Sequence, residues 1–181
     1  MARPGLRVAI VVAVLVGGCS TDPSPDATPP TAVAQGQGFV LTMAVPTDHF
    51  AVGQAIDVRT TLAWTGPAPN VTIWGSGMSP VGFLFEELTG SHRKIGGLMI
   101  SNCSNHSYAR GVATPIPLAK TAAWSGDDPD AAFFQEFTKD PLLHLPAGRW
   151  RITADLGGYL AQCAMDAPGI SLQAVLEIGV G

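Results

Sequence analysis

Charged residues are scarce in this chain of 181 residues: Asp, Glu, Lys and Arg make up 13% of it, about half the usual share. The ten Lys and Arg residues form no cluster, and the formal net charge is −4. A chain without a basic patch lacks the electrostatic footprint of a nucleic-acid-binding protein, and it offers no basic surface to anionic lipid headgroups. We therefore expect no nucleic-acid partner.

Complete catalytic and metal-binding motifs are also missing. Ser76 lies between two glycines, but the G-x-S-x-G spacing of a nucleophile elbow is not met. The acidic segment 127–130 lacks the D-x-[DN]-x-[DN]-G pattern and the closing Glu of a calcium loop. The histidines fall in four separate segments, at His49, His92, His106 and His144. The sequence thus predicts no catalytic residue, no metal site and no cofactor.

The longest uninterrupted apolar run is short and stands near the beginning. Residues 8–16 are apolar, whereas a transmembrane helix needs about 20 such residues. Arg3 and Arg7 precede the run, and Gly17-Gly18-Cys19 ends it. A basic start, a short apolar stretch and small residues are the layout of a secretory signal. The alternatives are an uncleaved transmembrane helix, for which the run is too short, and an ordinary secreted protein.

The ending Val16-Gly17-Gly18-Cys19 resembles the lipobox of bacterial lipoproteins. This resemblance implies that residues 1–18 are a lipoprotein signal peptide and that Cys19 becomes an acylated N-terminus. Two or three acyl chains would anchor the protein to a membrane without spanning it. The expected location is therefore the cell envelope, on the outer face of a bacterial membrane.

A proline-rich segment follows the cysteine. Residues 20–37 contain four prolines and almost no bulky apolar residue, so they cannot bury enough surface to fold. We expect residues 19–37 to form a lipid-anchored, disordered tether. Residues 38–181 would then form a single folded domain.

That domain is predicted to consist of short strands. Ile56–Trp64 is the clearest of them, because apolar and polar residues alternate along it. Glycine and proline, 21 and 15 in number, favour turns between short elements. Further strands are expected over 39–45, 71–74, 82–88, 94–100, 109–117, 119–124, 150–156 and 170–178.

One short helix is expected after residue 127. Asp128 would be its N-cap and Pro129 its first residue. Its apolar stripe would consist of Phe133, Phe134 and Phe137. The predicted fold class is therefore all-β, an immunoglobulin-like antiparallel β-sandwich with one short helix.

Three segments resemble strands of immunoglobulin-like domains found in bacterial lipoproteins: 52–64, 145–156 and 170–178. Their order is also similar to that of the intracellular proteinase inhibitor family, which would imply protease inhibition. The chain departs from classical immunoglobulin domains, because it has neither their Cys…Trp…Cys spacing nor a tyrosine corner.

Two cysteines remain if Cys19 carries lipid. Cys103 and Cys163 form an even pair in a protein expected to be exported, which predicts a Cys103–Cys163 disulfide. A catalytic or metal-bound thiol is the alternative, but no second CxxC or HxxxH pair completes such a site.

Charged and aromatic residues are the last candidates for a site. Glu86 and Glu87 would face residues 92–94 across a hairpin, which indicates a solvated sheet edge. Trp64 and Trp150 lie on the apolar side of alternating strands and should be buried. Loops at the ends of the sandwich would supply the candidate binding residues, namely Met78, Tyr108, Trp124, Asp127 and Asp128.

Three functions follow from these observations. The first is a non-enzymatic binding module on the surface or in the periplasm, with an envelope protein, peptide or glycan as its partner. The second is the protease-inhibitor-like module suggested by the resemblance. The third is a hydrolase whose site is assembled from distant His and Asp residues.

Overall fold

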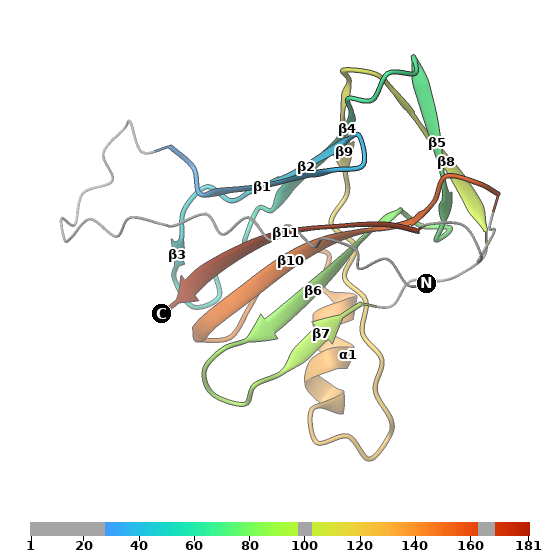
Figure 1. Cartoon of the computed structure of the whole chain (residues 1–181). Helices are drawn as coiled ribbons and strands as arrows, with labels where there is room; N and C mark the ends of the chain where they lie inside the picture. Colours follow the sequence, from blue (N-terminus) through green and yellow to red (C-terminus); the bar gives the residue numbers. More distant parts are fainter. Residues whose placement is uncertain (1–27, 98–102, 163–168) are drawn as a thin grey trace, which may run out of the picture.

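The computed structural model describes residues 28–97, 103–162 and 169–181. Two β-sheets and one short helix make up this part of the chain (Figure 1). The predicted class, an all-β sandwich with one short helix, is confirmed. Within the described ranges, no helix has both the length and the hydrophobicity needed to cross a membrane.

Sheet A has four antiparallel strands in the order β1-β2-β4-β9. β1 and β2 are joined by Gln37 and Gly38, whose φ angles are 51° and 81°. Two consecutive residues with positive φ are typical of a tight hairpin turn. The strands are β1 (Thr31–Gly36), β2 (Phe39–Ala44), β4 (Arg59–Trp64) and β9 (Ala113–Ile116).

β1 corrects the predicted boundary between tether and domain. Residues 31–37 were expected in a disordered tether, but β1 pairs with β2 from Thr31↔Ala44 to Gly36↔Phe39. An edge strand can form from small residues because the hydrogen bonds to its neighbour hold it. Ala32 and Ala34 suffice to pack against the core. The other predictions for the N-terminal region concern the signal peptide and residues 19–27, which lie outside the described residues.

Sheet B has seven strands and is organised around β10. β11 pairs with β10 over its whole length, from Gly148↔Val180 to Tyr159↔Gly169. The other edge of β10 is shared by β6, opposite 150–156, and β5, opposite Tyr159. β3 pairs with β11 in parallel, β8 pairs with β5, and β7 pairs with β6. The strands are β3 (His49–Phe50), β5 (Asn70–Gly75), β6 (Val81–Glu87), β7 (Lys94–Gly96), β8 (Ser104–Ala109), β10 (Gly148–Tyr159) and β11 (Gly169–Val180).

The strand β8 was missed, and with it the environment of Tyr108. The segment was expected to be a binding loop, but it pairs with β5 over six residues. Tyr108 is 4% exposed, and burial raises the pKa of its hydroxyl to about 12. Tyr108 is therefore a core residue and does not belong to a binding loop.

The two tryptophans predicted to be buried are in the core. Trp150 is fully enclosed, and its indole N–H donates to the Pro146 carbonyl at 2.9 Å. The ring of Trp64 lies against Gly38 and Gly66, where added Cβ atoms would stand 2.3 and 2.1 Å from it. The two glycines thus make room for the Trp64 ring.

The side chain of Gln37, in the turn between β1 and β2, forms hydrogen bonds with β11 of the other sheet. The Gln37 amide donates to the Gly169 carbonyl at 3.1 Å and accepts from the Ser171 N–H at 3.2 Å. These two bonds imitate the pairing that a neighbouring strand would give the edge of β11. Gln37 therefore links the two sheets.

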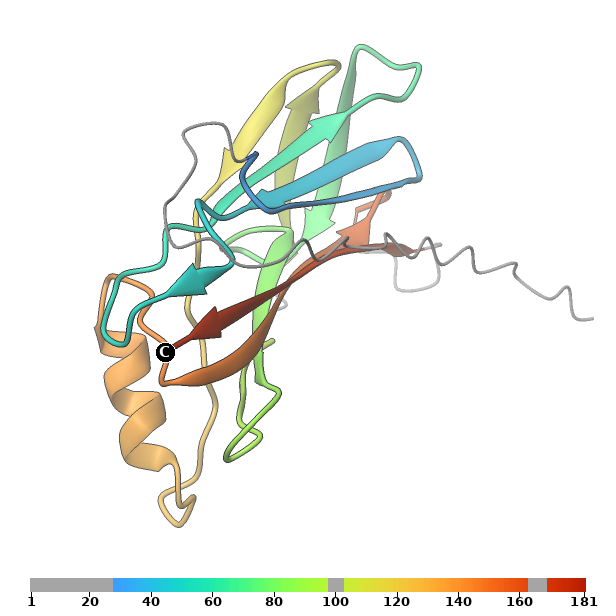
Figure 2. The ribbon, with the colours of Figure 1, turned by 90° about the vertical axis from the view of Figure 1, so that its left-hand side faces the viewer.

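Helix α1 (Ala131–Lys139) lies on the same side of sheet B as sheet A (Figure 2). Phe137 of the helix meets Phe85 of β6 edge to face, with ring centroids 5.5 Å apart. The N-cap is Asp130, so the predicted Asp128 cap is wrong by two residues. The Asp128 carboxylate instead accepts from the Asp130 N–H at 2.8 Å and forms a turn before the helix. The strand expected over 119–124 does not form.

Arg93, in the turn between β6 and β7, ties this hairpin to α1. Its guanidinium contacts Asp130 at 2.8 Å and Glu87 at 3.5 Å, and it lies 4.7 Å from the centre of the Phe133 ring. The Glu87 side chain is only 4% exposed. Glu87 was expected on a solvated edge, but its side chain is buried and paired with Arg93.

Candidate functional site on the outer face of sheet B

The structure does not gather the five predicted binding residues into one site. Met78 is exposed in the connection between β5 and β6. Trp124 is partly exposed and its ring lies 6.4 Å from that of Phe134 on α1. Asp127 and Asp128 are in the same loop before α1, whereas β8, which carries Tyr108, lies at the opposite end of the molecule (Figure 1).

The cysteine predictions fall mostly beyond the described residues. Cys19 and Cys163 both lie there, and Cys103 directly precedes β8. Lipidation of Cys19 and the Cys103–Cys163 disulfide therefore remain predictions.

A catalytic triad is not assembled by the described residues. The His106 ring contacts the Ser76 carbonyl oxygen at 2.8 Å, while the Ser76 hydroxyl lies 3.5 Å from the Met78 N–H. His49, on β3, pairs with the preceding residue Asp48. His144 pairs with Asp140, and both of these residues follow α1. Ser76, a histidine and a carboxylate thus do not form one hydrogen-bonded chain here. The described ranges also hold no group of three residues suited to a metal ion.

A hollow of about 270 Å³ lies where β5 and β6 diverge along β10. Glycines provide four of the seven residues that line it, so it offers few side-chain groups to a ligand. The lining consists of Gly75, Ser76, Gly157, Gly158, Tyr159, Gly169 and Ile170.

The outer face of sheet B is a better candidate. Alternate residues of β6, β10 and β11 point into the core, among them Phe85, Ile152 and Ile178. Their neighbours in sequence point to the opposite face, away from α1 and sheet A. No described element covers this face (Figures 1 and 2).

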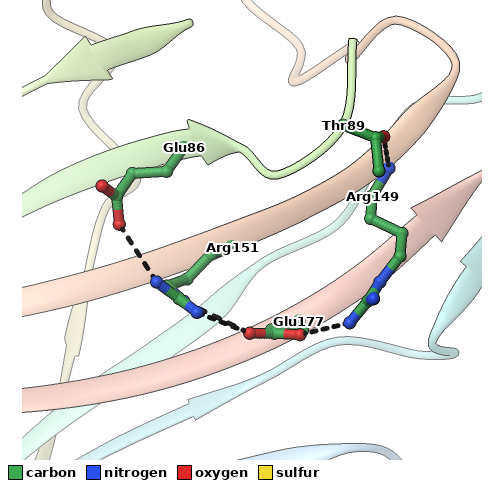
Figure 3. A network of polar contacts seen from close by, with 5 residues as sticks. All are labelled: Glu86, Thr89, Arg149, Arg151 and Glu177. Carbon is green, nitrogen blue, oxygen red and sulfur yellow. Dashed lines mark hydrogen bonds and ion pairs between the residues drawn. The ribbon is translucent and has the colours of Figure 1, made fainter. Parts of the chain in front are cut away.

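A row of charged residues crosses the outer face from β7 to β11. Figure 3 shows the part of it that runs from Glu86 through Arg151 to Glu177. Lys94 contacts Glu86 at 2.8 Å, and Arg151 contacts Glu86 at 3.7 Å and Glu177 at 2.8 Å. Arg149 also contacts Glu177, at 2.8 Å. We call Lys94, Glu86, Arg151 and Glu177 the charged row. Its members alternate in sign in the order of the strands.

The contacts of the row keep Glu86, Arg151 and Glu177 ionised. A hydrogen bond from Lys94 holds the pKa of the Glu86 carboxyl below its ordinary value, and a hydrogen bond from Arg151 does the same for Glu177. The pairing with Glu177 raises the pKa of the Arg151 guanidinium. Exposed pairs of this kind each stabilise a protein by only about 0–1 kcal/mol. The row therefore orders charge on the surface and contributes little to holding the fold.

Beside the charged row lies a less polar one. By the strand register, Gly96, Leu84, Thr153 and Val175 are neighbours across the same four strands. Val175 is 43% exposed. One step further along the strands, burial raises the pKa of the Asp155 carboxyl, although a hydrogen bond with Gln173 acts in the opposite direction. The face thus combines fixed charges with an exposed aliphatic side chain.

Only part of this site could be predicted from the sequence. The pairing of Glu86 with Lys94 was expected from the hairpin, and the structure confirms it. Arg149, Arg151 and Glu177 were not singled out. The alternation of apolar and polar residues predicts that they share one face of their strands. Which strands lie side by side, however, depends on contacts between residues far apart in the sequence.

No known protein family, no characterised protein and no solved structure matches the chain. The resemblances to lipoprotein immunoglobulin-like domains and to proteinase inhibitors therefore remain predictions.

Proposed function

We propose that this protein is a lipid-anchored, non-catalytic binding module of the bacterial cell envelope that binds a partner protein through the outer face of sheet B. This proposal rests on the charged row. Its charged groups are positioned before any partner arrives, so binding would cost little side-chain entropy. Arg and exposed aliphatic groups together are typical of protein contact surfaces.

The start of β1 shortens the tether that the proposal requires. With Cys19 as the anchor and Thr31 as the first strand residue, residues 20–30 separate them, which is eleven residues (31 − 19 − 1). Fully extended, eleven residues reach about 35 Å. The sandwich would therefore stay near the membrane, which favours a partner in the same layer of the envelope.

The proposed disulfide agrees with the strand order. Tyr159, at the end of β10, is opposite Trp74 of β5, and Trp74 is opposite Asn105 of β8. Cys103 lies two residues before Asn105, and Cys163 lies four residues after Tyr159. Both cysteines thus follow or precede strands at the same end of sheet B. A Cys103–Cys163 bond would fix that end.

Photo-cross-linking in intact cells tests the proposed surface. A benzophenone amino acid replaces Val175 in the full chain, and in a control it replaces Val33 on β1. The two valines have similar exposure, 43% and 49%, but Val33 is not on sheet B. We expect protein adducts from position 175 and at most weak ones from position 33.

Mass spectrometry of the same purified adducts tests the anchor, because the N-terminal peptide should begin at an acylated Cys19. Equal adduct yields at the two positions would contradict the proposed surface. An unacylated chain that retains residues 1–18 would contradict the proposed anchor.

A further inference from the structure

We infer that the protein bound by the outer face of sheet B is a second copy of this chain, with the two faces packed against each other. This inference rests on the proposed function and names its partner. The evidence lies in the order of the charges and in the residues beside them.

The charged row is complementary in charge to the same row read in the opposite direction. Read from β7 to β11, Lys94, Glu86, Arg151 and Glu177 carry the signs plus, minus, plus, minus. A two-fold axis parallel to the strands and between β6 and β10 reverses this order in the second copy. Lys94 then faces Glu177 of the second copy, and Glu86 faces its Arg151. Every charge in the row meets the opposite sign, and a two-fold axis is the commonest symmetry of protein dimers.

The same axis also matches the neighbouring row. It places Leu84 opposite Thr153 of the second copy and Val175 opposite its Gly96, as the strand register requires. The most exposed side chain of this row therefore meets a residue that has no side chain. Neither row places like charges together.

A strongly charged partner would fit this face less well. Lys94, Arg149 and Arg151 are balanced by Glu86, Glu177 and Asp155, so the face has no net charge. An acidic or basic partner would meet repulsion at half of these positions. A second copy meets none within the charged row.

The size of the face indicates a weak association. Three strands about 23 Å long and the three-residue β7, about 10 Å long, lie about 4.8 Å apart and cover roughly 380 Å² on each copy, below the roughly 500 Å² per copy of a stable specific interface. Confinement of both copies to one membrane raises their effective concentration and would compensate for weak contacts. We therefore expect a dimer that forms in the membrane and dissociates on dilution.

Two differently tagged full-length copies are cross-linked in intact membranes before detergent extraction, and their co-purification tests the inference. One variant, Glu86→Lys with Glu177→Lys, makes the row entirely positive, and another, Lys94→Glu with Arg151→Glu, makes it entirely negative. Each variant paired with itself should lose co-purification by at least about tenfold, because like charges then face each other across the interface. The positive and negative variants together should recover the level of the original chain.

A second pair of variants leaves the charged row intact. Val175→Arg should abolish co-purification, because it fills the space opposite Gly96, whereas Val33→Arg should not change it. Thermal unfolding of each variant verifies that it is folded. The inference fails if the original copies do not co-purify, or if each charge-reversed variant pairs with itself as well as they do. If position 175 cross-links to a different protein while the original copies do not co-purify, the proposed function stands and this inference is rejected.

Discussion

Replacing Gly96 with alanine is expected to lower the free energy of unfolding by about 3–5 kcal/mol, through overpacking and a strained backbone. Gly96 has a φ of +107°, and a Cβ there would stand 2.1 Å from the Phe83 carbonyl oxygen. That oxygen accepts a hydrogen bond from the Gly97 N–H at 3.1 Å. The alanine would therefore push β7 away from β6 and break this bond. Chemical denaturation of the two proteins measures the difference.

The neighbouring glycine provides the control. Gly97 also has a positive φ, +80°, but no atom lies within 4 Å of the position of its Cβ. Gly97→Ala should cost only about 1–2 kcal/mol, the price of an alanine in the left-handed region. Equal losses for the two variants would show that backbone conformation alone, and not the approach of Phe83, requires Gly96.

Replacing Arg93 with methionine is expected to destabilise the fold by about 2–4 kcal/mol, because it leaves a buried carboxylate without its cation. Arg93 is the cation that contacts both Glu87 and Asp130, and Glu87 is almost completely enclosed. The variant also loses the contact between the guanidinium and the Phe133 ring. Denaturation in urea at neutral pH gives the size of the loss.

Lys94→Met is the matched control on the next residue. Lys94 is 72% exposed on its side chain and pairs with Glu86 on the surface, so its loss should cost no more than about 1 kcal/mol. Adding Glu87→Gln to Arg93→Met should restore part of the stability, since the uncompensated charge is then removed. If the double variant is no more stable than Arg93→Met alone, the buried charge is not the cause.

The strands that could be predicted are those whose side chains alternate between core and solvent. β4, β10 and β11 follow this pattern, and so do the positions of Trp64 and Trp150. β1 and β8 could not be found in this way. β1 packs with small alanines, and Tyr108 is the one buried residue of β8. Both strands are held by pairing with neighbours that are themselves strongly apolar.

The candidate site was only partly predictable for a similar reason. Alternation places Arg151 and Glu177 on the outer face of their strands, but the row exists only because β10 lies between β6 and β11. The buried Glu87 pairs with Arg93, and Arg93 also contacts Asp130 at the start of α1, which lies far along the chain. Neither arrangement can be predicted from local sequence patterns.

Cysteine labelling measures whether a partner covers the outer face of sheet B in the envelope, as we propose. Val175→Cys and Val33→Cys are expressed separately as full chains, and the rate of reaction with N-ethylmaleimide is measured in intact membranes and after purification and dilution. We expect position 175 to react several times more slowly than position 33 in membranes, and the two rates to converge after dilution. Equal rates in the membranes would contradict the proposal.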